Sequence, residues 1–260
     1  MDQNLIEKVL KRVASEMETA GTAGHAPPAK DIGVTEYVGT AIGNTIGLVI
    51  ASVDPQLMET MKLGSYRSIG IIGGRAALGP YIMAVDDAVK ATNTEVISVE
   101  GPRDGDGGAG PGALIIIGAD DVSDARRGVE TALDALEKYF GDIYVTDAGH
   151  LEYQYTARAS YCIEKSFGSP LGKAFGLVCA APAAIGVVLS DIAVKAANVQ
   201  VVSYTSPNKG VGYNYSNEIT LTITGDSGAV RQAVRATIDV GKKLLGAMGE
   251  APKSYATPYI

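Results

Sequence analysis

Asp86-Asp-Ala-Val-Lys90-Ala-Thr-Asn93-Thr-Glu-Val-Ile-Ser98 recurs 105 residues later as Asp191-Ile-Ala-Val-Lys195-Ala-Ala-Asn198-Val-Gln-Val-Val-Ser203. Eight of these 13 positions are identical, where ordinary residue frequencies would give about one. Solenoid and propeller repeats are about 20–50 residues long, whereas a repeat of this length has the size of a domain. The chain therefore contains two similar domains in tandem.

The repeat extends well beyond the opening stretch. Phe175–Val178 corresponds to Ile69–Ile72 at a spacing of 106 residues. At a spacing of 105, six later residues match: Asp121, Arg126, Val129, Asp134, Lys138 and Gly141 correspond to Asp226, Arg231, Val234, Asp239, Lys243 and Gly246. We predict one domain over residues 36–141 and another over 142–250.

Each half has the pattern of an α+β domain. Apolar, β-branched runs predict strands at 46–53, 69–72, 95–99 and 113–117 in the first half, and at 153–159 early in the second. Helices are expected after Pro55, near Pro80 and after Asp121, and again at 162–167. With about four strands and three helices per half, we expect a mostly antiparallel sheet with its helices on one side.

Composition limits the classes of function. The 260 residues are 46% hydrophobic and 20% charged, a surplus of apolar residues that predicts buried contacts between subunits. The formal net charge of −7 argues against nucleic acid as a partner, because such proteins need a basic face.

Three further features bear on the compartment. Cys162 and Cys179 have neither zinc-site spacing nor a CxxC motif, so they are expected to be reduced core thiols of a protein in a reducing cytosol. The longest apolar stretch, 175–189, is too short for a membrane span and contains Pro182. The charged residues of the N-terminus do not fit a signal peptide.

The N-terminal 18 residues have the pattern of an amphipathic helix. Its apolar face includes Ile6, Val9, Leu10 and Val13. Residues 19–35 are rich in glycine, alanine and proline and predict a flexible linker. Because so short a helix is marginal alone in water, it needs a partner. Packing on its own domain and binding to a membrane surface are the alternatives.

Few residues fit a catalytic role. The two histidines are His25, in the linker, and His150, which we expect to be structural or exposed. None of the familiar hydrolase, nucleotide or metal motifs occurs, so we predict a protein that is not an enzyme and has no cofactor and no metal.

Two equivalent loops, 101–112 and 206–217, differ completely while their surroundings agree, so function is expected there. The first lacks the Lys-Ser/Thr of a phosphate loop and the further ligands of a calcium loop. An oligomeric metabolite-binding or regulatory protein, with an enzymatic role at Asp104 and Asp106, remains the alternative. The candidate ligand-lining residues are Asp104, Asp106, Gly107, Gly108, Gly110, Asn208, Lys209, Gly210 and Gly212.

The second repeat carries a recognisable signature. Lys195-Ala-Ala-Asn198-Val-Gln-Val-Val-Ser-Tyr204, a loop, a strand and then Thr224-Gly-Asp-Ser-Gly-Ala-Val230 resemble the signature of the bacterial-microcompartment shell domain. The first repeat resembles it more loosely. Two such domains resemble the tandem, trimer-forming class of that family, and the elements before Ile69 and Phe175 resemble its circularly permuted version. The N-terminal helix is similar to that of shell proteins from propanediol- or glycerol-utilising compartments.

The resemblance implies a function. The chain would form a pseudohexameric homotrimer that tiles a microcompartment shell in the bacterial cytoplasm together with other shell proteins. Its pores would pass small diol, triol or aldehyde metabolites, and the N-terminal helix would link the shell to enclosed enzymes. Neither a membrane nor nucleic acid is an implied partner.

The resemblance also assigns residues. Lys90, Asn93, Lys195 and Asn198 correspond to the tiling edge, and the two divergent loops correspond to pore linings. Channels within each subunit make Gly73, Gly74 and Arg75 a second candidate lining. The chain departs from simple hexameric members because both the short lysine-isoleucine-glycine pore pattern and the proline-arginine-proline-histidine edge motif are absent.

Overall fold

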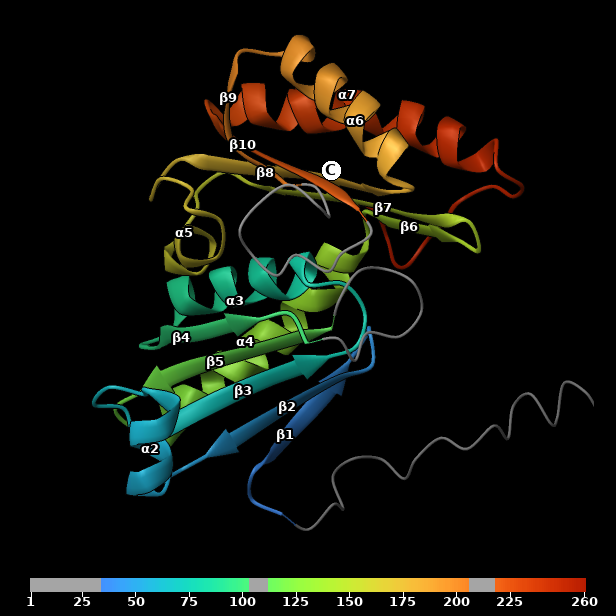
Figure 1. Cartoon of the computed structure of the whole chain (residues 1–260). Helices are drawn as coiled ribbons and strands as arrows, with labels where there is room; N and C mark the ends of the chain where they lie inside the picture. The colour runs from blue at the N-terminus through green and yellow to red at the C-terminus, as the bar shows by residue number, and fades with distance from the viewer. Residues whose placement is uncertain (1–33, 103–111, 206–217) are drawn as a thin grey trace, which may run out of the picture. The chain divides into compact units, whose positions relative to one another are not determined.

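The computed structural model describes residues 34–102, 112–205 and 218–260. The first of its two antiparallel sheets has the strand order β1-β2-β3-β5-β4 (Figure 1). Its strands are β1 (Tyr37–Ala41), β2 (Thr45–Ile50), β3 (Ser68–Gly74), β4 (Glu95–Glu100) and β5 (Ala113–Ala119). The helices of this half are α2 (Pro55–Met61), α3 (Gly79–Ala91) and α4 (Val122–Phe140).

The second sheet repeats this order and adds one strand at its edge. Its order is β11-β6-β7-β8-β10-β9. The strands are β6 (Ile143–Thr146), β7 (Gly149–Thr156), β8 (Ala174–Ala181), β9 (Val199–Thr205), β10 (Ile219–Gly225) and β11 (Lys253–Ser254). The helices are α5 (Tyr161–Phe167), α6 (Ala183–Ala196) and α7 (Ser227–Gly246). The predicted α+β class, with three helices in each half, is confirmed.

Strand pairing shows the duplication directly. In the first sheet Ile46 lies opposite Gly73, which lies opposite Leu114. In the second sheet Glu152 lies opposite Cys179, which lies opposite Thr220. Each residue of the second set is 106 positions after its equivalent in the first, so the two ladders have the same register.

The long helices begin where the sequence predicts. The Asp121 carboxylate accepts hydrogen bonds from the backbone N–H groups of Ser123 and Asp124, at 2.8 and 3.0 Å, and so caps α4. Asp226 caps α7 in the same way through Gly228 and Ala229. The helix start is therefore encoded locally in both repeats.

Glycines in the strands let the long helices lie close to the sheets. A Cβ atom on Gly70 of β3 would lie 2.6 Å from a methyl carbon of Val129 and 3.0 Å from the carbonyl oxygen of Ala125, both on α4. Gly176, its equivalent on β8, would meet Val230 of α7 at 2.8 Å. The strands need glycine here because the helix leaves no room for a side chain.

Some elements differ from the sequence prediction. Strands β1, β6 and β11 were not predicted, and β7 begins at Gly149 instead of Tyr153. Strand β2 ends at Ile50, three residues before the expected end, because the chain turns so that Val53 can enter a cluster with Leu63, Ile69 and Ile116. Pro182 divides the long apolar stretch between β8 and α6, as its position in the stretch indicates. In the described part of the chain no helix is long and apolar enough to cross a membrane.

The two halves share one core. On one side α3 packs against α4 and the first sheet. On the other side it contacts α5 and β7 of the second half. The shared cluster joins Tyr81, Ile82 and Val85 of α3 to Ile163 of α5 and Phe175 of β8.

Phe167 of α5 stacks on Phe175 of β8, whereas the adjacent Gly176 faces α7. In the first half, α2 likewise packs on Ile69 of β3, beside the Gly70 that faces α4. The short helices thus lie on the opposite sheet face from the long ones, and the expectation of helices on one side holds for the long helices.

The close approach at Gly70 generates a prediction. Gly70→Ala should lower the free energy of unfolding by roughly 1–3 kcal/mol, because the added methyl overpacks the contact between β3 and α4. Gly246→Ala adds the same group at the end of α7, where the nearest atom is 3.4 Å away, and should be neutral or stabilising. Urea denaturation measures both, and equal stabilities of the two variants would contradict the packing argument.

Candidate functional site

The repeated stretch lies on α3 and β4 in the first half and on α6 and β9 in the second. The two helices have different surroundings. Ile82 and Met83 of α3 are each 1% exposed, whereas their equivalents on α6, Val187 and Val188, are 51% and 45% exposed. The same helical face is therefore covered in one repeat and uncovered in the other.

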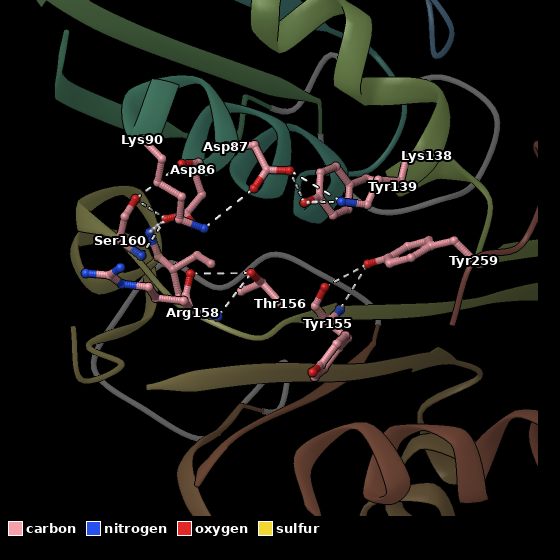
Figure 2. Close-up of polar contacts among 11 residues, drawn as sticks. Asp86, Asp87, Lys90, Lys138, Tyr139, Tyr155, Thr156, Arg158, Ser160 and Tyr259 are labelled. Carbon is pink, nitrogen blue, oxygen red and sulfur yellow. Dashed lines mark hydrogen bonds and ion pairs between the residues drawn. The ribbon is translucent and has the colours of Figure 1, made fainter. Parts of the chain in front are cut away.

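A buried carboxylate joins the covered face of α3 to the second half. One oxygen of Asp86 accepts hydrogen bonds from the backbone N–H of Ser160 at 2.9 Å, the hydroxyl of Ser160 at 2.6 Å and the backbone N–H of Ile163 at 3.3 Å (Figure 2). These donors lie at the N-terminus of α5. The other oxygen lies 2.6 Å from the Lys90 ammonium. Asp86 thus caps a helix of the other half while its charge is neutralised by Lys90.

A second polar group lies next to it. Asp87 is 3.5 Å from Lys90 and 3.4 Å from the Lys138 ammonium, and it also accepts a hydrogen bond from the hydroxyl of Tyr139 (Figure 2). Burial, reinforced by that bond to Asp87, raises the pKa of Tyr139 well above its usual value. The ring therefore stays a neutral hydrogen-bond donor.

The four predicted edge residues have different surroundings. Lys90 is held by Asp86 and Asp87, with 28% of its side chain exposed. Lys195 is 73% exposed and pairs only along its own helix, with Asp191 at 2.7 Å, among the ion pairs of the described residues. Asn93 and Asn198 are both exposed. Of the two predicted edges, the one on α6 is therefore the more accessible to a neighbouring molecule.

The three described lining candidates follow one another at the end of β3. Gly74 is buried, and a Cβ atom there would lie 2.0 Å from the Tyr81 hydroxyl oxygen, so this glycine serves packing. Gly73 is half-buried and Arg75 is exposed. The other lining candidates and the docking residues of the N-terminal helix lie outside the described residues.

A cavity of about 390 Å³ lies where the two halves meet. It is lined by Leu78 and Ile82 at the start of α3, by Ser98 and Val99 of β4, and by Lys165 and Phe167 of α5, with Ile97 and Ser166 completing the wall. The Lys165 ammonium donates to the carbonyl oxygen of Val96 at 3.3 Å. Leu78 ends the short loop that follows Gly74, the last residue of β3, whereas Gly73, Gly74 and Arg75 are not among the residues that line the cavity.

The sequence prediction missed a buried polar cluster on the second sheet. His150 is buried and its Nε2 lies 2.9 Å from a carboxylate oxygen of Glu218. Glu152 is also buried, which raises its pKa to about 7; the charge of Glu218 adds to this and His150 opposes it. Cys179 accepts a hydrogen bond from the Thr220 hydroxyl at 3.4 Å. Alternating polar residues at 150, 152 and 154 were the sequence signal that could have indicated it.

Comparison with known proteins identifies the family. The model of the BMC domain matches twice, at residues 68–147 and 174–252. The chain is 53% identical over 263 residues to the bacterial microcompartment shell protein PduB of Citrobacter freundii, covering 98% of this chain and 97% of that protein.

Solved structures agree with this match. The crystal structure of a trimeric bacterial microcompartment shell protein PduB superposes with a TM-score of 0.83 at 52% identity, over 87% of this chain and all of that one. EtuB from Clostridium kluyveri gives a TM-score of 0.84 at 52% identity, over 87% of this chain and 99% of that chain. These matches confirm the resemblance carried by residues 195–230. The chain therefore belongs to the BMC-domain family and is a structural shell protein of a bacterial microcompartment.

Proposed function

We propose that three copies of this chain close into a pseudohexameric ring. The rings would tile a microcompartment shell of the propanediol- or glycerol-utilising type in the bacterial cytoplasm, and they would pass small polar metabolites. The relatives at 52–53% identity are shell proteins, one of them described as trimeric. The chain's own role in this proposal is structural and involves no catalysis.

The observation that carries the trimer is the unequal burial of α3 and α6. Within one chain, α3 packs against α5 and against the face of the second sheet that α6 and α7 leave uncovered, here called the outer face. The equivalents of these partners are α2 and the outer face of the first sheet, where Leu57 and Ile46 are 45% and 40% exposed. The α6 face formed by Val187 and Val188 is the equivalent of the packed α3 face.

Each chain thus has a second, unused copy of both surfaces of its internal contact: the exposed face of α6, and α2 with the outer face of the first sheet. Docking α6 of one copy onto α2 and the first sheet of the next repeats the internal contact. Such a head-to-tail contact forms a ring when the rotation closes, and two domains per chain give six positions with three chains. The exposed apolar side chains would then be buried in an interface that resembles the hydrophobic core of a domain.

For tiling, the open edge of α6 is the favoured contact. The exposed pair between Lys195 and Asp191 contributes little to stability, as is usual for surface ion pairs. Lys195 can therefore exchange this partner for a group on a neighbouring ring at small cost. At the edge formed by α3, the Lys90 ammonium is held by a buried carboxylate. This edge would therefore offer a neighbouring ring mainly the aliphatic part of Lys90 and the side chain of Asn93.

For transport, loops 101–112 and 206–217, together with Gly73 and Arg75, remain the proposed linings. The cavity between the halves is large enough for a three-carbon diol or triol, and its wall mixes apolar groups with Ser98 and Lys165. Weak polar contacts of this kind allow a small molecule to enter and leave. The N-terminal helix is the proposed docking segment for enclosed enzymes.

The trimer proposal is tested by placing negative charges on the exposed face of α6. The double variant Val187→Asp/Val188→Asp should sediment as a monomer in analytical ultracentrifugation, because two carboxylates would have to be buried in each contact. Val122→Asp changes another exposed valine, at the first turn of α4, and should stay trimeric. A double variant that remains trimeric would exclude α6 from the contact.

The tiling edge is tested by Lys195→Ala. The variant should remain a trimer in solution but form fewer or no ordered sheets in negative-stain micrographs at high concentration. Lys173→Ala, which removes an exposed lysine in the turn before β8, is the control and should form sheets normally. Unchanged sheets from Lys195→Ala would count against the edge assignment.

The docking role is tested by deleting residues 1–30. Compartments with this variant should lose enclosed enzymes into the supernatant on sedimentation, while the purified trimer keeps its melting temperature. Val9→Asp/Val13→Asp should act like the deletion, because it places charge on the apolar face, and Lys8→Glu on the polar face should not. Full retention of enzymes by the deletion variant would refute the docking role.

A further inference from the structure

The buried polar cluster of the second sheet comes from three adjacent strands. His150 and Glu152 lie two residues apart on β7 and so share a face of the sheet. Cys179 on β8 lies opposite Glu152 in the ladder. Glu218 directly precedes β10 and is two residues before Thr220, which lies opposite Cys179. The register thus brings a histidine, a cysteine and two glutamates to one site.

The geometry of three of these residues suits a metal ion. A ring nitrogen of His150, the sulfur of Cys179 and a carboxylate oxygen of Glu218 all lie within 4.8 Å of one another. A central ion bound at about 2.0–2.3 Å by each ligand needs such atoms roughly 3–4 Å apart, so small side-chain rotations complete the set. His150 and Cys179 are buried, and Glu218 keeps 12% of its side chain exposed.

The first half shows that the fold does not need this cluster. At the same register, 106 positions earlier, it has Asn44, Ile46, Gly73 and Gly112 in place of His150, Glu152, Cys179 and Glu218. Ile46 and Gly73 make the same ladder pair as Glu152 and Cys179. An apolar pair therefore forms the same sheet, whereas placing the buried carboxylate of Glu152 near the partly buried one of Glu218 and a thiol costs free energy unless a cation compensates them.

We propose that His150, Cys179 and Glu218 bind one zinc ion per chain. Zinc takes nitrogen, sulfur and oxygen ligands together, whereas magnesium and calcium prefer oxygen alone. Three protein ligands leave a fourth position for water or for the carboxylate of Glu152. The ion would join β7, β8 and β10, which lie side by side in Figure 1.

The position of the ion connects it to the contact between the halves. Glu152 lies against the first residue of α3: a Cβ atom on Gly79 would fall 1.7 Å from its carboxylate oxygen. Zinc would lower the repulsion between Glu152 and Glu218 at this contact. Zinc is bound by the thiolate form of cysteine, so binding would displace the proton of the Cys179 thiol.

The test uses the full-length trimer, stripped with a chelator and reloaded with zinc chloride. After gel filtration we expect one zinc per chain by elemental analysis and a higher melting temperature than in the stripped protein. Cobalt(II) in place of zinc should give a thiolate-to-metal absorption band.

The chain provides matched controls. Cys179→Ser should lose the absorption band and weaken zinc binding at least tenfold, whereas Cys162→Ser, at the other buried thiol, should keep both. Glu218→Gln, at the partly exposed ligand, tests the same site with little risk to folding, which circular dichroism verifies for each variant. Absence of zinc from the folded wild-type trimer, or equal binding by wild type, Cys179→Ser and Glu218→Gln, would overturn the proposal.

Discussion

The buried carboxylate of Asp86 fixes how the two halves of the chain meet. A buried charge is tolerated only when its hydrogen bonds are satisfied and its charge is paired. Asp86 achieves both by accepting bonds from the N-terminus of α5 and pairing with Lys90. Lys90 lies on α3 itself, whereas the hydrogen bonds form only when α5 lies with its N-terminus at Asp86. The placement of the second sheet against the first half, and of the cavity between them, therefore depends on this group.

Local signals made much of the fold predictable. The repeat defined the two halves, and Asp121 and Asp226 marked the starts of α4 and α7 because an N-cap acts within three residues. Strands β1, β6 and β11 were missed because they are short strands at or near the sheet edge, where pairing with a neighbour decides their conformation. Of these, β11 has only two residues, and it pairs with a strand more than 100 positions earlier.

The candidate sites were less predictable because their surroundings come from distant parts of the chain. Lys90 and Lys195 stand in nearly identical sequences, yet only the first has a buried aspartate as partner, since only α3 is covered by α5. His150, Cys179 and Glu218 have no metal-site spacing in the sequence, and the strand register alone unites them. The family resemblance supplied the function, which composition and spacing could not have given.

The two repeats have diverged where their contacts differ. Inside the chain, Gly79 of α3 leaves room for the carboxylate of Glu152 on the opposing sheet. At the equivalent positions, α6 has the exposed Ala184 and the first sheet has the exposed Ile46. In the internal contact the small Gly79 faces the long polar Glu152. In the proposed contact between chains, the apolar Ala184 and Ile46 would face each other. Similarly α5 relies on Asp86 from the other half, whereas α2 is capped by its own Asp54. In the proposed trimer, α2 would therefore need no second copy to complete its cap, whereas α5 takes its cap from a group that is always present in the same chain.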